Sequence, residues 1–457
     1  MKIVPLADAL YLILERRNQP MHVGALLLIR LPPGKPQFVD DILQRAWASP
    51  VSPPFDQRLV RRWGLWFWQR HPSFDIKRHV RRIQTPQSPG ERSSLFETLS
   101  ELHGQPMDRS KPLWEHYIID GMEGGYAALY FKMHHAMADG VSGMRMLEEA
   151  MSHAADDEEA PFVWSVPPAG TGTPSVGSEA TRASAWAALR AGFRSFRRVL
   201  GTAIRAAFSR NPHHVALFQA PRTMFNQRIG ESRRFLARTI DLDRVKAVAA
   251  AKGATMNDAV LSLCGSTLRN YLEECEALPD KPLIAMVPVS LRSKSGGGNQ
   301  VTILLANLAT HVADPMERMN AVIGSVTAAK SLFRGLSPTE IAAMGTVRHA
   351  PSLLNLSTGL MPTRQSFNVI ISNLPGPGHP LHFQGAQVVH NYPVSIVLDG
   401  QALNITFQSY ADKLEFGVIA CPTAVPHLEV LMEGVELGLA ELESALGLAG
   451  RTEPVPV

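Results

Sequence analysis

Two adjacent histidines, His134 and His135, are followed by Asp139 and Gly140 in the pattern His-His-x-x-x-Asp-Gly. The imidazole of histidine gains and loses its proton near neutral pH, so it can take a proton from a hydroxyl and later return it. Neighbouring side chains on an extended strand point to opposite faces, so only one of the two histidines can enter a given cavity. We predict that His135 is the general base, that Asp139 orients the site, and that Gly140 makes a turn.

The elements around this pattern are those needed to position a catalytic turn. An apolar run at 126–131 predicts a strand that ends at the histidines, and 141–151 predicts a helix that follows them. Two other interpretations stay open. Paired histidines are often ordinary surface or core residues, and they can also bind a metal. A metal site is disfavoured because strand neighbours diverge and no cysteine or carboxylate stands at ligand spacing, so we expect no metal.

The pattern resembles the acyltransferase motif shared by chloramphenicol acetyltransferase, carnitine acyltransferases and the condensation domains of peptide synthetases. In those families the second histidine is the general base, and the aspartate is mainly structural because it pairs with an arginine. The resemblance therefore implies that His135 is the base, with His134 beside it. It also makes Arg292, at the end of an apolar segment, the candidate partner of Asp139.

Four further segments resemble the bacterial wax ester synthase/diacylglycerol acyltransferase family and occur in that family's order: 14–24, 111–114, 257–261 and 371–377. The resemblance implies an α/β fold with two chloramphenicol acetyltransferase-like domains, each a mixed sheet with flanking helices, and an active site in a tunnel at their interface. It implies transfer of a long-chain acyl group from acyl-CoA to a fatty alcohol or to diacylglycerol. No acyl-enzyme is implied, and no cofactor beyond acyl-CoA as substrate.

Each segment supplies site candidates that also have a purely structural interpretation. Pro112, Leu113 and Trp114 are expected to pack before the catalytic strand. Two candidate pairs could contact substrate or the oxyanion: Asn257 with Asp258, and Ser372 with Asn373. The first pair also suits the first turn of a helix that Thr255 caps. Ser372 could instead open the Pro-Gly-Pro turn that follows it.

The length and composition predict two domains. At 457 residues, with 45% hydrophobic residues, the chain exceeds a usual single core. A stretch rich in proline and glycine divides it into residues 1–155 with the histidine motif, a linker at 156–214, and residues 215–457. Residues 125–135 also align with 400–410, which suggests two like domains of which only the first kept the base.

Charge and cysteine content limit the compartment and the partners. Only 3 cysteines are present, which favours a reducing cytoplasm, and neither a secretory leader nor a membrane-spanning stretch is predicted. Contact with a membrane or lipid inclusion would then be peripheral. Two segments could provide it, a basic aromatic one at 58–82 and a basic amphipathic helix at 186–210. Either could instead be an ordinary surface, and the first could hold the phosphates of coenzyme A.

A net charge of +4 with no recognisable module argues against nucleic acid as a partner, and the chain is expected to be a monomer or homodimer. Two other functions stay open: an acyltransferase with a different acceptor, such as an amide-forming condensation domain, and an inactive binding or scaffold homologue. The intact histidine motif argues against the scaffold. The absence of a carrier-domain serine motif argues against the condensation domain.

Overall fold

The computed structural model describes residues 1–448 except 86–90, 139, 156, 167–200, 203–210, 212, 292–299, 338–339, 342, 346–349, 352–354, 356–357 and 359–360. Asp139 and Arg292 therefore lie outside the described residues. So does the helix predicted at 186–210, apart from residues 201–202.

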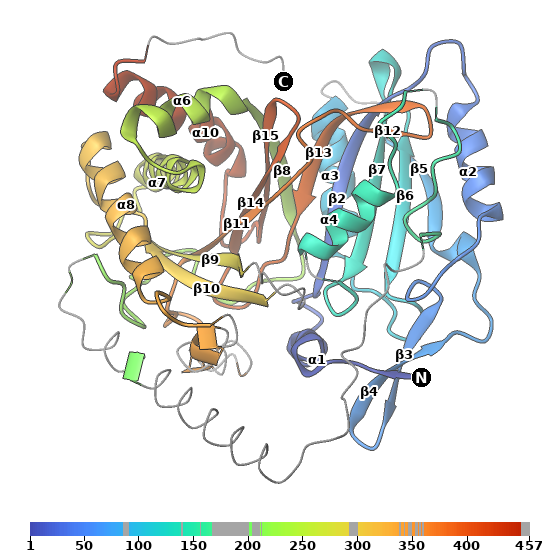
Figure 1. Ribbon diagram of the computed structural model, residues 1–457, viewed down its shortest axis with the longest axis horizontal. Helices are drawn as coiled ribbons and strands as arrows, with labels where there is room; N and C mark the ends of the chain where they lie inside the picture. Colours follow the sequence, from blue (N-terminus) through green and yellow to red (C-terminus); the bar gives the residue numbers. More distant parts are fainter. Residues whose placement is uncertain are drawn as a thin grey trace.

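Two six-stranded mixed sheets lie side by side and form the centres of two sheet-rich regions (Figure 1). In spatial order, the first sheet contains β12 (His382–Phe383), β13 (Ala386–Val394), β2 (His22–Arg30), β7 (Tyr126–His134), β6 (Trp114–Asp120) and β5 (Val80–Gln84). The second contains β10 (Gln300–Asn307), β9 (Ile284–Leu291), β11 (Val369–Leu374), β14 (Leu403–Tyr410), β15 (Lys413–Ala420) and β8 (Arg234–Asp241). The mixed α/β fold with two sheets was predicted from the sequence, and it is confirmed.

Helices cover the sheets because each strand carries apolar residues on both faces. One face of the first sheet packs on α3 (Glu91–Gly104), and the other packs on α2 (Phe38–Ala48) and α4 (Gly140–Glu149). Four helices cover the side of the second sheet that faces away from the first (Figure 1): α6 (Leu242–Lys252), α7 (Met256–Glu274), α8 (Pro315–Ser331) and α10 (Leu428–Ala445). Short 3₁₀ turns occur at Ile76–Arg78 and Glu123–Gly125.

The two sheets share a four-strand pattern, which corrects the internal alignment made from the sequence. In β2-β7-β6-β5 the first two pairings are antiparallel and the third is parallel. In β8-β15-β14-β11 the order of pairings is the same. Strand β7, which ends at His134, therefore corresponds to β15, whereas the sequence alignment matched it to β14. Both β14 and β15 are almost wholly buried, so hydrophobic pattern alone did not distinguish neighbouring strands.

One strand of the second half belongs to the first sheet. β13 pairs antiparallel with β2 from Gln387 opposite Arg30 to Val394 opposite Gly24, and β12 extends it. The predicted division of the chain at residue 215 stays untested as a domain boundary, but these strands do not follow it. β13 also contacts the second sheet, where His390 Nδ1 lies 2.9 Å from Glu415 Oε1 of β15.

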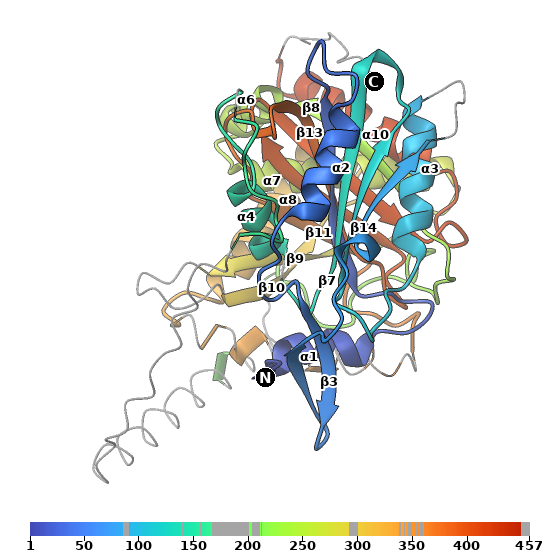
Figure 2. The same ribbon diagram turned by 90° about the vertical axis from the view of Figure 1, so that its right-hand side faces the viewer.

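A third, small sheet lies beside the N-terminus and projects from the body (Figure 2). Its order is β1 (Lys2–Ile3), β4 (Leu65–Arg70) and β3 (Gln57–Arg62). Helix α1 (Leu6–Leu14) follows β1 and packs Leu10, Tyr11 and Leu14 against apolar residues of β9, β10 and β11. Helix α1 thus connects the small sheet to the second large one.

Candidate active site

The turn that carries the two histidines follows the end of β7. The backbone N–H of His134 donates to the carbonyl oxygen of Leu113 at 2.9 Å, and that of His135 donates to Met21 at 2.8 Å. A third bond of 2.8 Å, from the N–H of Met137 to the carbonyl of His134, closes the turn. Hence the turn is fixed on one side by the start of β6 and on the other by the segment that leads into β2.

His134 is buried, and each of its ring nitrogens faces a polar group. The N–H of Ala136 donates to Nδ1 at 3.0 Å, so Nδ1 is an acceptor and the proton of the neutral ring resides on Nε2. Nε2 lies 3.4 Å from Oε1 of Glu15, just past the end of α1. This tautomer leaves His134 no basic nitrogen for a substrate, so its geometry is that of a positioning residue.

Glu15 connects three parts of the site. Its Oε2 accepts a 2.6 Å hydrogen bond from Nε of Arg109, while Oε1 accepts one of 3.3 Å from the N–H of Met21. Burial acts to raise the pKa of Glu15, but His134 and Arg109 outweigh it, and the pKa is lowered overall. Glu15 is therefore ionised near neutral pH and attracts the proton of His134 Nε2.

His135 is half-buried, and its ring lies on that of Tyr11 from α1. The ring centroids are 3.9 Å apart and the planes differ by 9°, which is a stacked arrangement. Since the backbone N–H of His135 is also bonded to Met21, both the main chain and the ring plane are fixed. Residues 134 and 135 thus have different surroundings, as the alternation of strand side chains predicts.

The start of α4 meets the end of β11, which places two of the predicted motifs together. A Cβ added at Gly140 would lie 3.3 Å from Cδ2 of Leu374. Ser372 is two residues earlier on the same strand, so it shares the face of Leu374 and is half-buried there. Asn373 points to the opposite face and is exposed. Of this pair, Ser372 has the better position for a role near the histidine turn.

Asn257 and Asp258 lie in the first turn of α7, and a capping box accounts for Asp258. Its Oδ2 accepts from the N–H and Oγ1 of Thr255 at 3.1 and 2.6 Å, and Thr255 Oγ1 accepts from the N–H of Asp258 at 3.3 Å. Oδ1 lies 4.0 Å from Nζ of Lys330 at the end of α8. These contacts belong to the helical layer on the outer side of the second sheet, so a substrate contact by either residue stays a prediction.

Pro112, Leu113 and Trp114 are buried where β6 begins. The indole Nε1 of Trp114 donates to the carbonyl of Phe55 at 2.7 Å, and its ring stacks on Trp164. Leu113 supplies the carbonyl that holds His134. The structure therefore places this segment in the core directly behind the catalytic turn.

A buried polar network that sequence reasoning missed lies on the His134 face of β7. Lys132 is fully buried, and its Nζ donates to the carbonyls of Leu102 and Gln105 at 2.8 and 2.7 Å. Burial, opposed by Glu115, lowers the pKa of Lys132. Burial also lowers the pKa of His103 to about 3, with Lys132 adding to the effect. The available signal was alternation: Tyr130, Lys132 and His134 share one face of a strand that is otherwise apolar.

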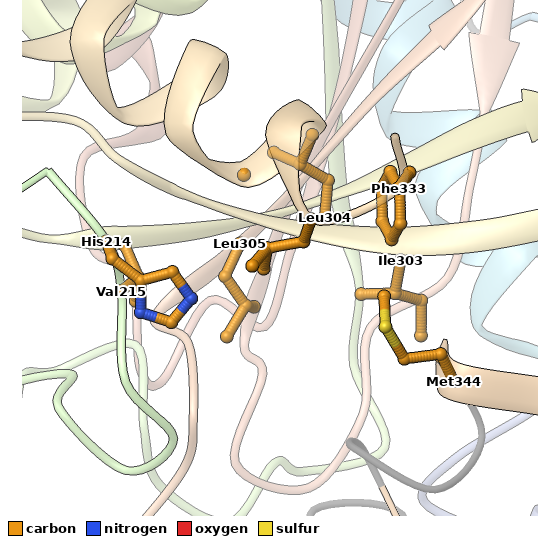
Figure 3. Close-up of a pocket in the computed structure, with 10 residues that line it drawn as sticks. His214, Val215, Ile303, Leu304, Leu305, Phe333 and Met344 are labelled. Carbon is orange, nitrogen blue, oxygen red and sulfur yellow. The ribbon is translucent and has the colours of Figure 1, made fainter. Parts of the chain in front are cut away.

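An apolar cavity, partly open to solvent, lies between β10 and α8 (Figure 3). Val215, Ile303, Leu305, Phe333 and Met344 line it together with His214. Three of these, Val215, Ile303 and Leu305, belong to the hydrophobic cluster that also contains Tyr11. The cavity is thus joined by continuous apolar packing to the ring that lies on His135.

Two observations concern the described residues alone. No group of three or more histidine, cysteine, aspartate or glutamate side chains among them is arranged to hold a metal ion. None of the helices that the structure describes is both long and apolar enough to cross a membrane.

Comparison with known structures first identifies the class of fold. The starter condensation domain of rhizomide synthetase is 12% identical and aligns with a TM-score of 0.55, covering 99% of this chain and 95% of that one. At this identity the likeness shows the fold alone, and it is the chloramphenicol acetyltransferase-like arrangement that the sequence predicted.

The family follows from closer similarity. The family model for the wax ester synthase/diacylglycerol acyltransferase catalytic domain matches residues 5–260, and the model for the C-terminal domain of the same family matches 297–443. The O-acyltransferase WSD of Acinetobacter baylyi is 41% identical over 98% of both chains. The wax ester synthase/diacylglycerol acyltransferase of Marinobacter aquaeolei VT8 is 37% identical, with a TM-score of 0.81 over 98% of this chain and 100% of that one. The chain therefore belongs to the wax ester synthase/diacylglycerol acyltransferase family, as predicted, and is an acyltransferase.

Proposed function

We propose that the protein transfers a long-chain acyl group from acyl-CoA to the hydroxyl of a fatty alcohol or of diacylglycerol, with His135 as general base. The observation that carries this proposal is the different environment of the two histidines. His134 carries its proton on Nε2 and accepts a backbone N–H at Nδ1, so it has no nitrogen for a substrate. His135 is half-buried, with its ring plane fixed by Tyr11.

The reaction is a single displacement at the thioester. His135 removes the proton of the acceptor hydroxyl as the oxygen attacks the carbonyl carbon, and a tetrahedral oxyanion forms. Collapse of this intermediate breaks the C–S bond, and the imidazolium returns its proton to the departing thiolate of coenzyme A. No enzyme side chain becomes acylated. No electrons are transferred to or from a cofactor, so acyl-CoA serves only as substrate and we propose no resident cofactor.

The oxyanion needs a hydrogen-bond donor that is already in place. Ser372 is our candidate because it shares a strand face with Leu374, which contacts the start of α4. Asn257, Asp258 and Asn373 are less favoured, since Asp258 is engaged in its helix cap and Asn373 points away. The ion pair between Asp139 and Arg292 remains part of the proposal through the family resemblance alone.

The acceptors are lipids, so we propose that the protein works at the surface of the inner membrane or of lipid inclusions without crossing the membrane. It would act there from the cytoplasm as a monomer or homodimer. A protein that is recruited reversibly can reach acyl-CoA in solution and an alcohol or diacylglycerol at the lipid surface.

The test is release of coenzyme A thiol from palmitoyl-CoA by the purified protein, with hexadecanol, with diacylglycerol, with a long-chain amine, or with no acceptor. We expect release to require an acceptor, and His135→Ala to lower kcat by about a hundred- to ten-thousand-fold. Release that ignores the acceptor would identify a thioesterase. No release under any condition would favour a scaffold, and release driven only by an amine would favour the amide-forming alternative.

A further inference from the structure

Most of the large apolar side chains that are exposed in the described part of the chain belong to the small sheet or to the neighbouring helix α1. Met1, Ile3, Ile13, Trp63 and Leu65 are 61%, 52%, 64%, 89% and 52% exposed, and all five lie on the small sheet, its N-terminal end or α1. The other three, Phe218, Met361 and Leu437, come from separate parts of the chain. Single exposed apolar residues are ordinary, but a cluster of them marks an interaction surface.

Trp63, at the tip of the small sheet, has a strained backbone conformation. Arg62 pairs with Leu65, so Trp63 and Gly64 form a two-residue hairpin loop, and their φ angles are 49° and 80°. Such a loop favours Asn-Gly, because a bulky side chain at positive φ is strained. A large aromatic residue at this position, almost fully in solvent, is explained by a role that requires it there.

One face of the small sheet lies outside the hydrophobic core clusters of the described residues. Ile3 and Val60 both lie opposite Phe67, which makes an apolar row across the three strands, and none of the three joins a hydrophobic core cluster. The other face is anchored: Leu59 and Trp68 pack in a cluster with Ala136 of the catalytic turn. The small sheet is therefore fixed at its base and open on its outer face.

The charge on the small sheet is positive. Its strands carry Lys2, Arg58, Arg61, Arg62 and Arg70, and the one carboxylate paired with them in the described residues is Asp56, 2.9 Å from Nε of Arg70. Arg62, next to Trp63, shares the open face with Leu65, whereas Arg61 lies over the ring of Trp66 at 5.7 Å on the anchored face. Arginine beside tryptophan suits the boundary between lipid headgroups and acyl chains. There the indole ring is partly hydrated and the guanidinium can bind a lipid phosphate.

We propose that this small sheet, together with the exposed side of α1, is the surface by which the enzyme docks on an anionic lipid bilayer. Trp63 and Leu65 enter the headgroup layer, and Arg61 and Arg62 pair with lipid phosphates. The proposal deepens the proposed function, because α1 connects this surface to the chemistry. Tyr11 of α1 lies on His135, whereas Ile13 of the same helix is exposed.

Flotation of the full-length protein with vesicles tests the surface without using activity. The vesicles contain phosphatidylcholine alone or mixed with phosphatidylglycerol, at low and at high salt. Trp63→Asn removes the ring and leaves the Asn-Gly turn that this loop favours, so the hairpin is kept. Leu437→Asn, at an exposed position of α10, is its matched control. The double variant Arg61→Gln/Arg62→Gln tests the two arginines. Arg334→Gln, at an exposed position after α8, is the control for the loss of an arginine.

We expect binding to mixed vesicles that weakens with salt. Trp63→Asn should lower the partition coefficient about tenfold. The double arginine variant should lower it on anionic vesicles by about fivefold per arginine. The controls should float like the unaltered protein. If Trp63→Asn and the double variant also float unchanged, the surface is wrong, even if thiol release from palmitoyl-CoA is normal. If the unaltered protein floats with mixed vesicles but releases no thiol from palmitoyl-CoA, the proposed chemistry is wrong and the docking surface stands.

Discussion

The ring of Tyr11 lies parallel to the imidazole of His135 at a centroid distance of 3.9 Å. The first helix of the chain therefore fixes the ring of a residue more than a hundred positions later. The same helix ends next to Glu15, which faces the neighbouring His134. One short segment thus gives two adjacent histidines different surroundings.

Tyr11 should act through the orientation of His135. Tyr11→Ala removes the stacking partner, and we expect kcat to fall about tenfold while KM changes little, because a misplaced base lowers the rate of proton transfer. Tyr11→Phe keeps the ring and should retain most of the activity. The comparison is steady-state kinetics on palmitoyl-CoA and hexadecanol. Equal losses in both variants would mean that the hydroxyl matters, and stacking would not explain the effect.

Glu15 should stabilise the fold only in its ionised form. Its pKa is lowered in the folded protein, so its ion pairs contribute at pH values above the ordinary glutamate pKa and are lost as pH falls through the lower, folded value. Glu15→Gln should cost about 2 kcal/mol at pH 7, and the difference should shrink toward pH 4. Urea denaturation measures it. Glu231→Gln, which breaks the exposed pair with Arg17, is the control and should cost almost nothing. A pH-independent cost for Glu15→Gln would exclude the ion-pair explanation.

His116 should make the protein sensitive to mild acid. It is buried, neither ring nitrogen has a hydrogen-bond partner in the described structure, and burial lowers its pKa to about 3. Between its unfolded pKa near 6.5 and that value, the unfolded chain binds a proton that the folded one does not, so stability falls as pH falls. From pH 7 to pH 5 this amounts to about 2 kcal/mol.

His116→Phe should remove that dependence and leave stability at pH 7 equal or higher, because an unsatisfied buried polar group is replaced. Unfolding free energies of both proteins at the two pH values decide the matter. Parallel pH profiles would show that His116 is protonated, or hydrated, in the native state.

Gly376 should tolerate no side chain. An added Cβ would lie 1.9 Å from the carbonyl oxygen of Ser409, so β11 and β14 could not keep their present approach. We expect Gly376→Ala to unfold at least about 3 kcal/mol more easily, or to accumulate in the insoluble fraction. Gly378→Ala, only two residues away, meets nothing within 4 Å and should unfold like the unaltered protein.

The apolar cavity near α8 should influence chain length. Met344→Ala enlarges it, so we expect the preference among acyl-CoA or alcohol chains to move toward longer ones. Met319→Ala removes an equally buried methionine of α8 that does not line the cavity, and it should lower stability without changing the preference. Ratios of kcat/KM across a chain-length series measure the shift. If Met344→Ala leaves the chain-length dependence of kcat/KM unchanged, the cavity does not bind the substrate chain.

Local and family signals predicted much of the fold. The strand that ends at the histidines, the helix that follows them and the cap at Thr255 all follow from pattern and propensity over a few residues. Contacts between distant segments were not predictable in this way. The pairing of Glu15 with Arg109 and His134, and the stack of Tyr11 on His135, depend on how α1 docks, which no local pattern states. The match of β7 to β14 was wrong for a related reason. The strand of the second sheet that is equivalent to β7 is defined by its pairing partners, which a local sequence pattern does not contain.

Because β13 crosses into the first sheet, we expect the two halves of this enzyme to fold as one unit. A polypeptide that stopped before β8 would leave the edge of β2 open, because β13, the strand that covers it, comes later in the chain than β8. During synthesis, the first half is then an intermediate that is prone to aggregate until β13 pairs with the exposed edge of β2. Exchange of halves between relatives would therefore have to carry β12 and β13 with the catalytic half, and a split version should regain activity only when both pieces fold together.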